Sequence, residues 1–560
     1  MKYKKNLDIA TLSVVSAIFF MLFFTLTYIS YLHLIFENCE TLFFILTIIS
    51  FTVTTISGIQ TIRNNEEQKK PDKKFKRKII THITILTVLF AMFIAISKFR
   101  YCYGVVDAEQ IFYHTFVSSA GMDFSTVITI SVPTLICTTV FLLTLVYINY
   151  ILKVKQKINK STIKILSFAS VISFILVITM IFTTIPILQF LYYQNFTESS
   201  FITNNYADPK TTKIEFPEQK RNLIYIYMES TENTFADYEN GGAFKDNLIP
   251  EITNLQKENI NFSNNTNIGG APSTYGITYT TASIFSQSFG LPLKIGTNAK
   301  PMPNAILPNK YNIFDILNDA GYSQHIVMGS DVNFGGLKEL FTSHGNVEIY
   351  DYQDMIKTGF IDKDYRVFWG VEDKLMYEYS KQKLGEISQK DEPFFFVMET
   401  VDTHNPNGYL CSECRNVFSS QYANVVSCAS RQLNNFVNWA KEQSWYDNTT
   451  IVVVGDHLSM KYDFFHDIPK NYIRTTTNII INPHPSLDFS NSNFSNRQFA
   501  NLDMLPTTLA SIGCKIEGDM LGLGTNLFST KETIFEKYGY EYVEEEFKKK
   551  TTFYKNIFEG

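Results

Sequence analysis

Three short apolar segments of this 560-residue sequence lead into side chains that can bind a metal ion. The segments and their polar residues are 222–228 before Glu229, 451–454 before Asp456 and His457, and 394–398 before His404. Carboxylate and imidazole ligands together suit a divalent cation such as Zn²⁺ or Mn²⁺. A single Asp-His pair is more often a helix cap, and a single Glu after a strand is usually a surface residue. The hypothesis of a metal site therefore depends on the three segment ends lying together.

A fourth segment, Asn267 to Pro292, supplies a candidate nucleophile. Its flexible first half leads into Thr280-Thr281-Ala282-Ser283, which is typical of a helix start. At a helix N-terminus, backbone N–H groups and the helix dipole favour a phosphate and stabilise an alkoxide. The competing interpretation is that these threonines only cap the helix.

A sheet is needed to bring these side chains together. Near-continuous apolar runs are typical of strands buried in a parallel sheet. The predicted strands are Asn222 to Met228, His325 to Met328, Phe394 to Met398, Ile451 to Val454 and Asn478 to Ile481. Helical patterns at Asn312 to Ala320 and Ala429 to Lys441 lie between them, which predicts an α/β fold with helices on both faces. Such sheets bind ligands at the carboxyl ends of their strands, where the polar residues lie.

The first part of the chain has a different composition. Through Tyr192 there are 18 Lys and Arg against 9 Asp and Glu, net +9, whereas the rest has 31 against 45, net −14. This division argues against a uniformly basic nucleic-acid binder and against a disordered chain. Five apolar runs without any charged residue predict transmembrane helices. They are Ile9 to Leu32, Leu42 to Ile62, Ile79 to Ser97, Val127 to Leu152 and Ile165 to Tyr192.

The basic residues near these runs predict the orientation of the chain. Lys2, Lys4 and Lys5 precede the first run, eight basic residues lie from Arg63 to Lys78, and five Lys lie from Lys153 to Lys164. By the positive-inside rule we expect all three segments to be cytoplasmic. The first run is long and lacks a small-residue cleavage site, so it is expected to remain as an anchor. The fifth run then exports everything after Tyr192.

Five motifs together resemble the phosphoglycerol transferase I family. This family is a branch of the alkaline phosphatase and sulfatase superfamily, related to lipoteichoic acid synthases and phosphoethanolamine transferases. The motifs are NLIYIYMESTENT (222–234), the segment Gly276 to Pro292 with its Tyr279-Thr280 pair, TVDTHNPNG (400–408), IVVVGDHLSM (451–460) and LGLG (521–524). The resemblance covers residues 217–530 in order, while the membrane half is similar only in architecture.

The resemblance implies a role for each motif residue. Glu229, Asp456 and His457 match the metal ligands, and Thr280 matches the catalytic threonine, which also contacts the metal. In another register the nucleophile is Thr278 or Thr281. His404 matches the histidine that contacts the substrate phosphate or the leaving group.

The substrate pocket departs from the related lipoteichoic acid synthases. These carry a His-Gly and a Trp-x-Arg cluster after the nucleophile, where this chain has Gly329-Ser330-Asp331. We take Ser330 and Asp331 as candidate substrate-binding residues, so the groups that hold the phosphate differ. Trp369 and Asp373 are further candidates, with core packing as the equal alternative.

Three cysteines follow the His404 motif. The family places two Cys in this loop, which implies a disulfide between Cys414 and Cys428, as suits an oxidising compartment. Cys411 competes as a partner for either one. A zinc site made from all three cysteines is the alternative, although it lacks an evident fourth ligand.

These observations predict four regions: a five-helix transmembrane domain (1–192), a juxtamembrane linker (193–220), an exported sulfatase-like α/β domain (221–530) and a solvated C-terminal tail (531–560). The resemblance implies a metal-dependent transferase (Mn, Zn or Mg) in a bacterial cytoplasmic membrane. Its expected donor is phosphatidylglycerol and its expected acceptor a glycan, with no nucleic-acid partner.

Other functions stay open. A phosphoethanolamine transferase acting on a glycan or lipid A would share the metal and the threonine. A sulfatase activity is disfavoured because no Cys/Ser-x-Pro-x-Arg sequence supplies a formylglycine. A non-enzymatic alternative is a membrane-anchored receptor that keeps the fold.

Overall fold

A computed structural model describes residues 8–32, 40–63, 73–154, 160–295, 306–490 and 492–554. The chain forms two compact units. The first comprises residues 1–106 and 124–186, and the second comprises residues 107–123 and 187–560. The predicted cytoplasmic segments lie partly outside the described residues, so their orientation stays a prediction.

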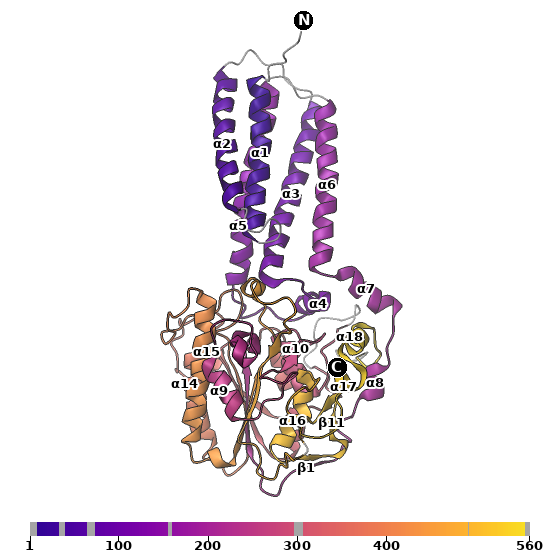
Figure 1. Cartoon of the computed structure of the whole chain (residues 1–560), viewed down its shortest axis with the longest axis vertical. Helices are drawn as coiled ribbons and strands as arrows, with labels where there is room; N and C mark the ends of the chain where they lie inside the picture. The colour runs from indigo at the N-terminus through magenta and orange to yellow at the C-terminus, as the bar shows by residue number, and fades with distance from the viewer. Residues whose placement is uncertain are drawn as a thin grey trace. The chain divides into compact units, whose positions relative to one another are not determined.

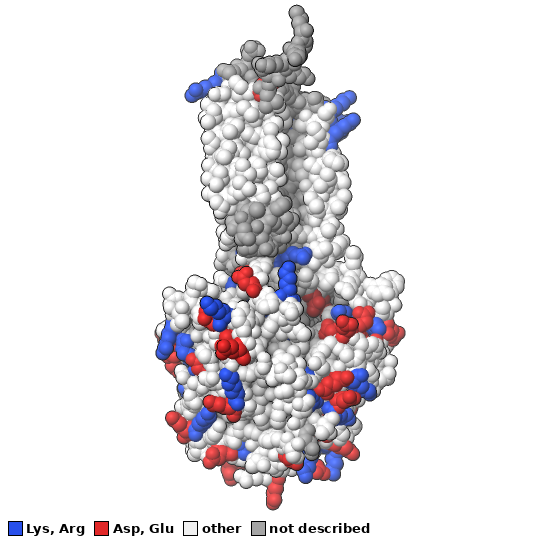
Figure 2. Space-filling view, viewed as in Figure 1, with Lys and Arg blue, Asp and Glu red and all other residues white. Residues whose placement is uncertain are grey.

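The first unit contains five long helices (Figure 1). They are α1 (Ile9–Tyr31), α2 (Glu40–Arg63), α3 (Lys73–Tyr103), α5 (Ser125–Val154) and α6 (Lys160–Thr184). Each is long and apolar enough to cross a membrane. Their surfaces expose large apolar side chains such as Leu135, Ile165 and Phe168, and the visible face of these helices is nearly free of charge along its length (Figure 2). The prediction of five apolar helices is confirmed.

The fifth helix is shorter than the predicted run to Tyr192. α6 ends at Thr184, and α7 (Ile187–Phe196) begins directly after Pro186. Proline lacks an N–H donor and disfavours helical backbone at the residue before it. The apolar run therefore divides into two helices at this point.

The chain enters the second unit twice. Between α3 and α5 it contributes residues 107–123, which include α4 (Ala108–Phe116), and it joins the second unit again from Ile187 onward. The compact units thus differ from the expected boundary at Tyr192. The expected linker is also folded, because α8 (Phe201–Asn205) buries Phe201 and Ile202. The composition of residues 107–123 did not indicate that this short segment between two spans folds with the second unit.

A six-stranded sheet forms the centre of the second unit, in the order β5-β4-β6-β2-β7-β9. The strands are β2 (Asn222–Met228), β4 (Ser323–Met328), β5 (Val347–Tyr350), β6 (Phe394–Glu399), β7 (Thr449–Gly455) and β9 (Asn478–Ile481). All five predicted strands are present. The sheet is mixed rather than purely parallel, because β9 runs antiparallel to β7. β5 was missed because it is a half-exposed edge strand without an apolar run.

Helices cover both faces of the sheet (Figure 1). One face carries α10 (Thr280–Phe289), α11 (Ile313–Asp319), α12 (Leu337–Thr342) and α16 (Met504–Ser511). The other carries α9 (Pro250–Glu258), α13 (Tyr352–Lys357), α14 (Asp373–Ile387) and α15 (Gln421–Lys441). Successive residues of β2 alternate between the two cores, as the two-residue period of a strand requires. Both predicted helical segments are found: α11 covers most of the first, and the second lies within α15.

Short antiparallel ribbons and a helical C-terminus complete the unit. The ribbons pair β1 (Ile214–Glu215) with β10 (Lys515–Ile516), β3 (Ala271–Pro272) with β8 (Thr475–Thr476), and β11 (Met520–Leu521) with β12 (Gly524–Thr525). The expected solvated tail is instead folded through residue 554, with α17 (Ile534–Tyr538) and α18 (Tyr540–Lys548). Val543 and Phe547, one helical turn apart, are fully buried, and the carbonyls of Phe547 and Lys549 accept hydrogen bonds from Lys294. The many charged residues of this segment made the apolar face of α18 hard to recognise in the sequence.

Candidate active site

The strand order brings the predicted metal ligands together. β2 lies between β6 and β7, with Tyr227 opposite Glu399 and Met228 opposite Gly455, so these three strands end at the same edge. Directly beyond this edge, ligand atoms of Glu229, Asp456 and His457 all lie within 4.8 Å of one another. All three side chains are buried.

Thr280 lies beside this group. Its hydroxyl is 3.1 Å from Glu229 Oε2 and 3.3 Å from His457 Nε2. It is the first residue of α10, and the preceding residue makes no side-chain cap. Thr281 instead donates to the carbonyl of Gly335, and Thr278 lines a small separate cavity with Asp107 and Glu109. The Thr280 hydroxyl therefore faces the cluster rather than capping the helix.

The cluster has the properties of a cation site. Asp456 Oδ2 lies 3.3 Å from His457 Nε2 and is buried without a hydrogen-bond partner among the described residues. Burial and the adjacent Glu229 carboxylate raise the pKa of Asp456 well above its ordinary value. His457 Nδ1 is 2.8 Å from the carbonyl of Leu458, so it carries the proton and leaves the Nε2 lone pair facing Glu229 and Thr280. Metal-bound histidines are oriented in this way, and the buried acidic pair requires a compensating charge, so the residues fit a divalent cation.

His404 lies on the loop that follows β6. Its Nδ1 is 2.8 Å from the carbonyl of Asn405, which leaves Nε2 free to accept a proton. The preceding Thr403 donates a 2.5 Å hydrogen bond to the carbonyl of Glu229. Burial by itself raises the pKa of Glu229. The imidazoles of His457 and His404, together with hydrogen bonds from the hydroxyls of Ser230 and Thr280, outweigh burial and lower that pKa. His404 is thus electrostatically part of the same site.

The second unit contains a match to a known protein family. Residues 221–507, half of the chain, match the family model described as Sulfatase. The chain belongs to the sulfatase family. The motifs that carry the resemblance to phosphoglycerol transferase I all lie in this unit, and four of the five fall within the matched range.

Individual relatives match this sulfatase-family chain over part of their length. It is 33% identical over 263 residues to phosphoglycerol transferase I of Citrobacter koseri, covering 46% of this chain and 33% of the relative. The Escherichia coli K12 protein of the same name is 32% identical over the same length, with the same coverage. The matches therefore span about one third of these relatives.

Solved structures are similar to this chain at low sequence identity. A Vibrio parahaemolyticus protein of the alkaline phosphatase superfamily has a TM-score of 0.45 at 20% identity and covers 62% of this chain and 79% of its own. The lipoteichoic acid synthase LtaP of Listeria monocytogenes has a TM-score of 0.43 at 18% identity, with coverages of 59% and 81%.

Two of the predicted substrate residues lie next to His404 in this sulfatase-family site. The Trp369 ring is 4.6 Å from the His404 ring, and in the part of the chain that the structure describes its buried Nε1 has no hydrogen-bond partner. Asp373 begins α14 and accepts hydrogen bonds from the backbone N–H groups of Val401 and Asp402, which positions the His404 loop. Burial raises the pKa of Asp373 to about 7.

The other two predicted substrate residues lie after β4. The Asp331 carboxylate accepts hydrogen bonds from Asn333 and Gln353, and the Ser330 carbonyl accepts one from the N–H of Tyr352. Both residues therefore take part in loop contacts, and their role toward a substrate stays a prediction.

Sequence reasoning missed a buried ion pair behind the site. Glu232, fully buried, binds Arg474 through Nε at 2.8 Å and through Nη2. Glu232 also accepts from the N–H of Ser459, so the pair bridges the loop after β2 and the loop after β7. Glu232 lies inside the NLIYIYMESTENT motif, which was the available signal, whereas nothing in the local pattern distinguishes Arg474.

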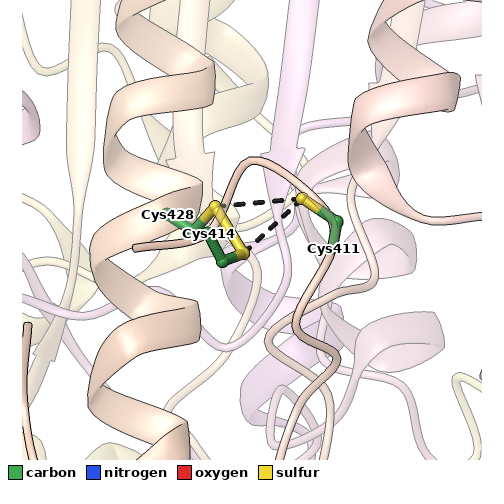
Figure 3. A group of neighbouring side chains, drawn as sticks. All are labelled: Cys411, Cys414 and Cys428. Carbon is green, nitrogen blue, oxygen red and sulfur yellow. Dashed lines mark hydrogen bonds between the residues drawn. A yellow bond between two sulfur atoms is a disulfide. The ribbon is translucent and has the colours of Figure 1, made fainter. Parts of the chain in front are cut away.

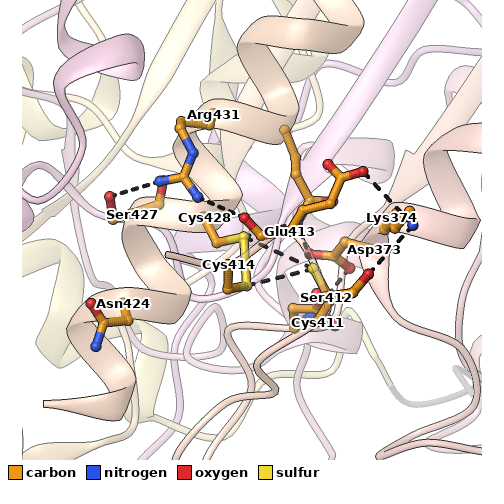
Figure 4. Close-up of a disulfide and its surroundings, with 12 residues drawn as sticks. Asp373, Lys374, Cys411, Ser412, Glu413, Cys414, Asn424, Ser427, Cys428 and Arg431 are labelled. Atoms are coloured by element: carbon orange, nitrogen blue, oxygen red, sulfur yellow. Dashed lines mark hydrogen bonds and ion pairs between the residues drawn. A yellow bond between two sulfur atoms is a disulfide. The ribbon is translucent and has the colours of Figure 1, made fainter. Parts of the chain in front are cut away.

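The three cysteines form one cluster (Figure 3). Cys414 and Cys428 are joined by a disulfide with Cα atoms 5.1 Å apart, and Cys411 Sγ lies 3.5 Å from Cys414 Sγ. Beside this bridge, Lys374 pairs with the carboxylate of Glu413, and Arg431 donates a hydrogen bond to the backbone carbonyl of Glu413 (Figure 4). The disulfide ties the loop that follows the His404 motif to α15.

Proposed function

We propose that this protein is a metal-dependent phosphoglycerol transferase. It moves the phosphoglycerol group of phosphatidylglycerol to a glycan hydroxyl through a covalent phospho-threonine and releases diacylglycerol. The observation that supports this proposal most is the Thr280 hydroxyl at the start of α10, within hydrogen-bond reach of both Glu229 and His457. The name of the Citrobacter koseri and Escherichia coli relatives also supports it.

The proposed first step forms the covalent intermediate. Thr280 Oγ1 attacks phosphorus, a new O–P bond forms, and the P–O bond to diacylglycerol breaks. His404 Nε2 takes the proton of the Thr280 hydroxyl and passes it to the leaving oxygen. Glu229, Thr280, Asp456 and His457 would hold Mn²⁺, Zn²⁺ or Mg²⁺, which would supply Lewis-acid stabilisation of the phosphoryl oxygens and favour the Thr280 alkoxide.

The proposed second step frees the enzyme. The acceptor hydroxyl attacks the same phosphorus, its proton passes through His404, and the Thr280 oxygen leaves with a proton. The product is a phosphodiester on the acceptor. The α10 N-terminus favours the phosphoryl group in both steps, because its N–H groups and dipole attract negative charge.

The membrane half supports a lipid donor. Five helices can anchor the chain in the bilayer that contains the phospholipid. The distribution of Lys and Arg favours a cytoplasmic N-terminus and a catalytic unit outside a bacterial cytoplasmic membrane, in a periplasm or at the cell surface. A threonine nucleophile and the lack of a Cys/Ser-x-Pro-x-Arg sequence favour phosphotransfer over sulfate hydrolysis.

The decisive experiment measures diacylglycerol release by the full-length protein in vesicles of labelled phosphatidylglycerol or phosphatidylethanolamine. Wild type should release diacylglycerol from phosphatidylglycerol, and Thr280→Ala should abolish the release. Thr278→Ala is the matched control and should remain active. Release by Thr280→Ala at the wild-type rate would refute the mechanism. Release only from phosphatidylethanolamine would instead assign the phosphoethanolamine transferase activity.

Metal analysis tests the ligand set independently of turnover. Purified wild type should contain about one equivalent of a divalent cation per chain, as a single cluster of this kind holds. Asp456→Asn should lose most of it while staying folded. A folded, metal-free wild type would favour the receptor alternative.

A further inference from the structure

Hydrogen bonds join residues 107–123, the segment between the third and fourth spans, to the part of the second unit that surrounds the proposed nucleophile. The hydroxyl of buried Tyr113 on α4 donates to the carbonyl of Gly335 at 2.8 Å, the same carbonyl that accepts from Thr281. The N–H of Gly335 donates to the carbonyl of Ser118 at 3.0 Å. α4 is therefore held against the loop that leads into α12 and against the first turn of α10.

A second set of contacts fixes both ends of this segment. Glu109 accepts a hydrogen bond from the N–H of Ile295, which follows the nucleophile helix. At the other end, Arg366 Nη2 donates to the carbonyl of Gly121 at 2.9 Å. A β-carbon on Gly121 would come within 2.7 Å of Asp331 Cβ, so the backbone packs closely there. These contacts give the segment a fixed position on the catalytic unit.

His114 is the residue that this arrangement presents to the site. Its neighbour Tyr113 is buried, whereas the His114 side chain is exposed. The His114 ring is 5.3 Å from the ring of Tyr279, the residue directly before Thr280. His114 thus lies beside the residue that leads into the nucleophile helix.

We propose that His114 is a substrate-binding residue that hydrogen-bonds to the head group of the lipid donor beside Thr280 and His404. This inference rests on the proposed function. None of the motifs of the catalytic unit includes His114, because it lies more than 100 residues before them.

The chemistry and the connectivity both favour a lipid head group. A neutral imidazole both donates and accepts hydrogen bonds, which matches the hydroxyls of a glycerol head group. α4 begins a few residues after α3 ends at Tyr103, and α5 follows from Ser125. The segment that carries His114 is therefore joined in sequence, at both of its ends, to helices that can span a membrane.

The test compares His114→Ala and His114→Gln with wild type in the phosphatidylglycerol vesicle assay. Thr115→Ala is the matched control, because Thr115 is the exposed next residue of the same helix. Loss of one substrate hydrogen bond should lower kcat/KM about 10- to 100-fold in His114→Ala, mainly through KM. His114→Gln, which keeps a donor and an acceptor, should recover part of this loss, and Thr115→Ala should behave as wild type.

The outcomes separate this inference from the proposed function. If wild type releases no diacylglycerol, the proposed function fails. If wild type is active and His114→Ala matches Thr115→Ala, the inference is overturned while the proposed function stands. A fall in melting temperature shared by both His114 variants, without recovery of KM in His114→Gln, would assign His114 a structural role and would also overturn it.

Discussion

Replacing Arg474 by Met tests whether the buried ion pair supports the site. The guanidinium binds both oxygens of Glu232, whose side chain is fully buried, and stacks 3.7 Å from the ring centroid of Phe465. Met keeps most of the apolar stem but removes the charge. Glu232 would then be a buried carboxylate without its counter-ion, which costs about 3–5 kcal/mol. For a unit of this size, such a loss lowers the melting temperature by about 5 °C.

The same change should weaken metal binding. Glu232 links the loop that carries Glu229 to the loop that carries Asp456, through its hydrogen bond from Ser459. Loosening this link should reduce the affinity of the purified full-length protein for a divalent cation about tenfold, as changes behind metal ligands commonly do.

A control in the same loop separates the pair from a general charge effect. Lys461 pairs with Asp463 only two residues away, and neither carboxylate nor ammonium is fully buried, so Lys461→Met should destabilise the fold less than Arg474→Met. Adding Glu232→Gln to Arg474→Met should restore part of the stability, because no unpaired charge remains. The reasoning is refuted if Arg474→Met melts and binds metal like the wild type.

Three further changes should affect stability. Replacing Cys414 and Cys428 by serine opens a bridge across 14 residues and should lower the free energy of unfolding by about 3 kcal/mol in non-reducing urea titrations; an unchanged midpoint would show that the bridge contributes nothing. Gly455→Ala places a β-carbon 1.8 Å from the carbonyl oxygen of Thr231, a backbone atom that cannot rotate away, so the variant should have a lower melting temperature than the wild type. An unchanged melting temperature would contradict the tight packing at this strand end. Burial raises the pKa of Asp503 from 3.8 to about 7, so its protonation stabilises the fold at acidic pH, and this stability is lost as pH rises toward about 7. Asp503→Asn should remove up to about 4 kcal/mol of that dependence between about pH 4 and pH 7, and parallel pH profiles of wild type and variant would disprove it.

The local pattern was sufficient for the buried strands. An unbroken apolar run followed by a polar residue located the ends of β2, β6 and β7, because a strand buried on both faces tolerates no charge and its end is where ligands bind. The edge strand β5 has no such run and was missed. Pro186 was present in the sequence, but the apolar residues on both sides of it gave the appearance of one long span.

The residue types of the site were also predictable, but their arrangement was not. Carboxylate, imidazole and hydroxyl groups at three strand ends and one helix start indicate metal-assisted phosphotransfer, because few side chains can supply that chemistry. The spacing alone could not choose among Thr278, Thr280 and Thr281. The packing of α10 against the sheet supports the proposal of Thr280, because among the described residues its hydroxyl is the one of the three that contacts Glu229 and His457.

By itself, the sequence determined five apolar helices, a mostly parallel sheet and the chemical character of the strand ends. These are local properties, set by hydrophobicity and residue type within a window of a few residues. Only the tertiary structure decided that β2 lies between β6 and β7, that Arg474 neutralises Glu232, and that α4 contacts the loop around Gly335. Such contacts join residues separated by more than 150 positions, and they arise from the packing of whole elements, which no local pattern encodes.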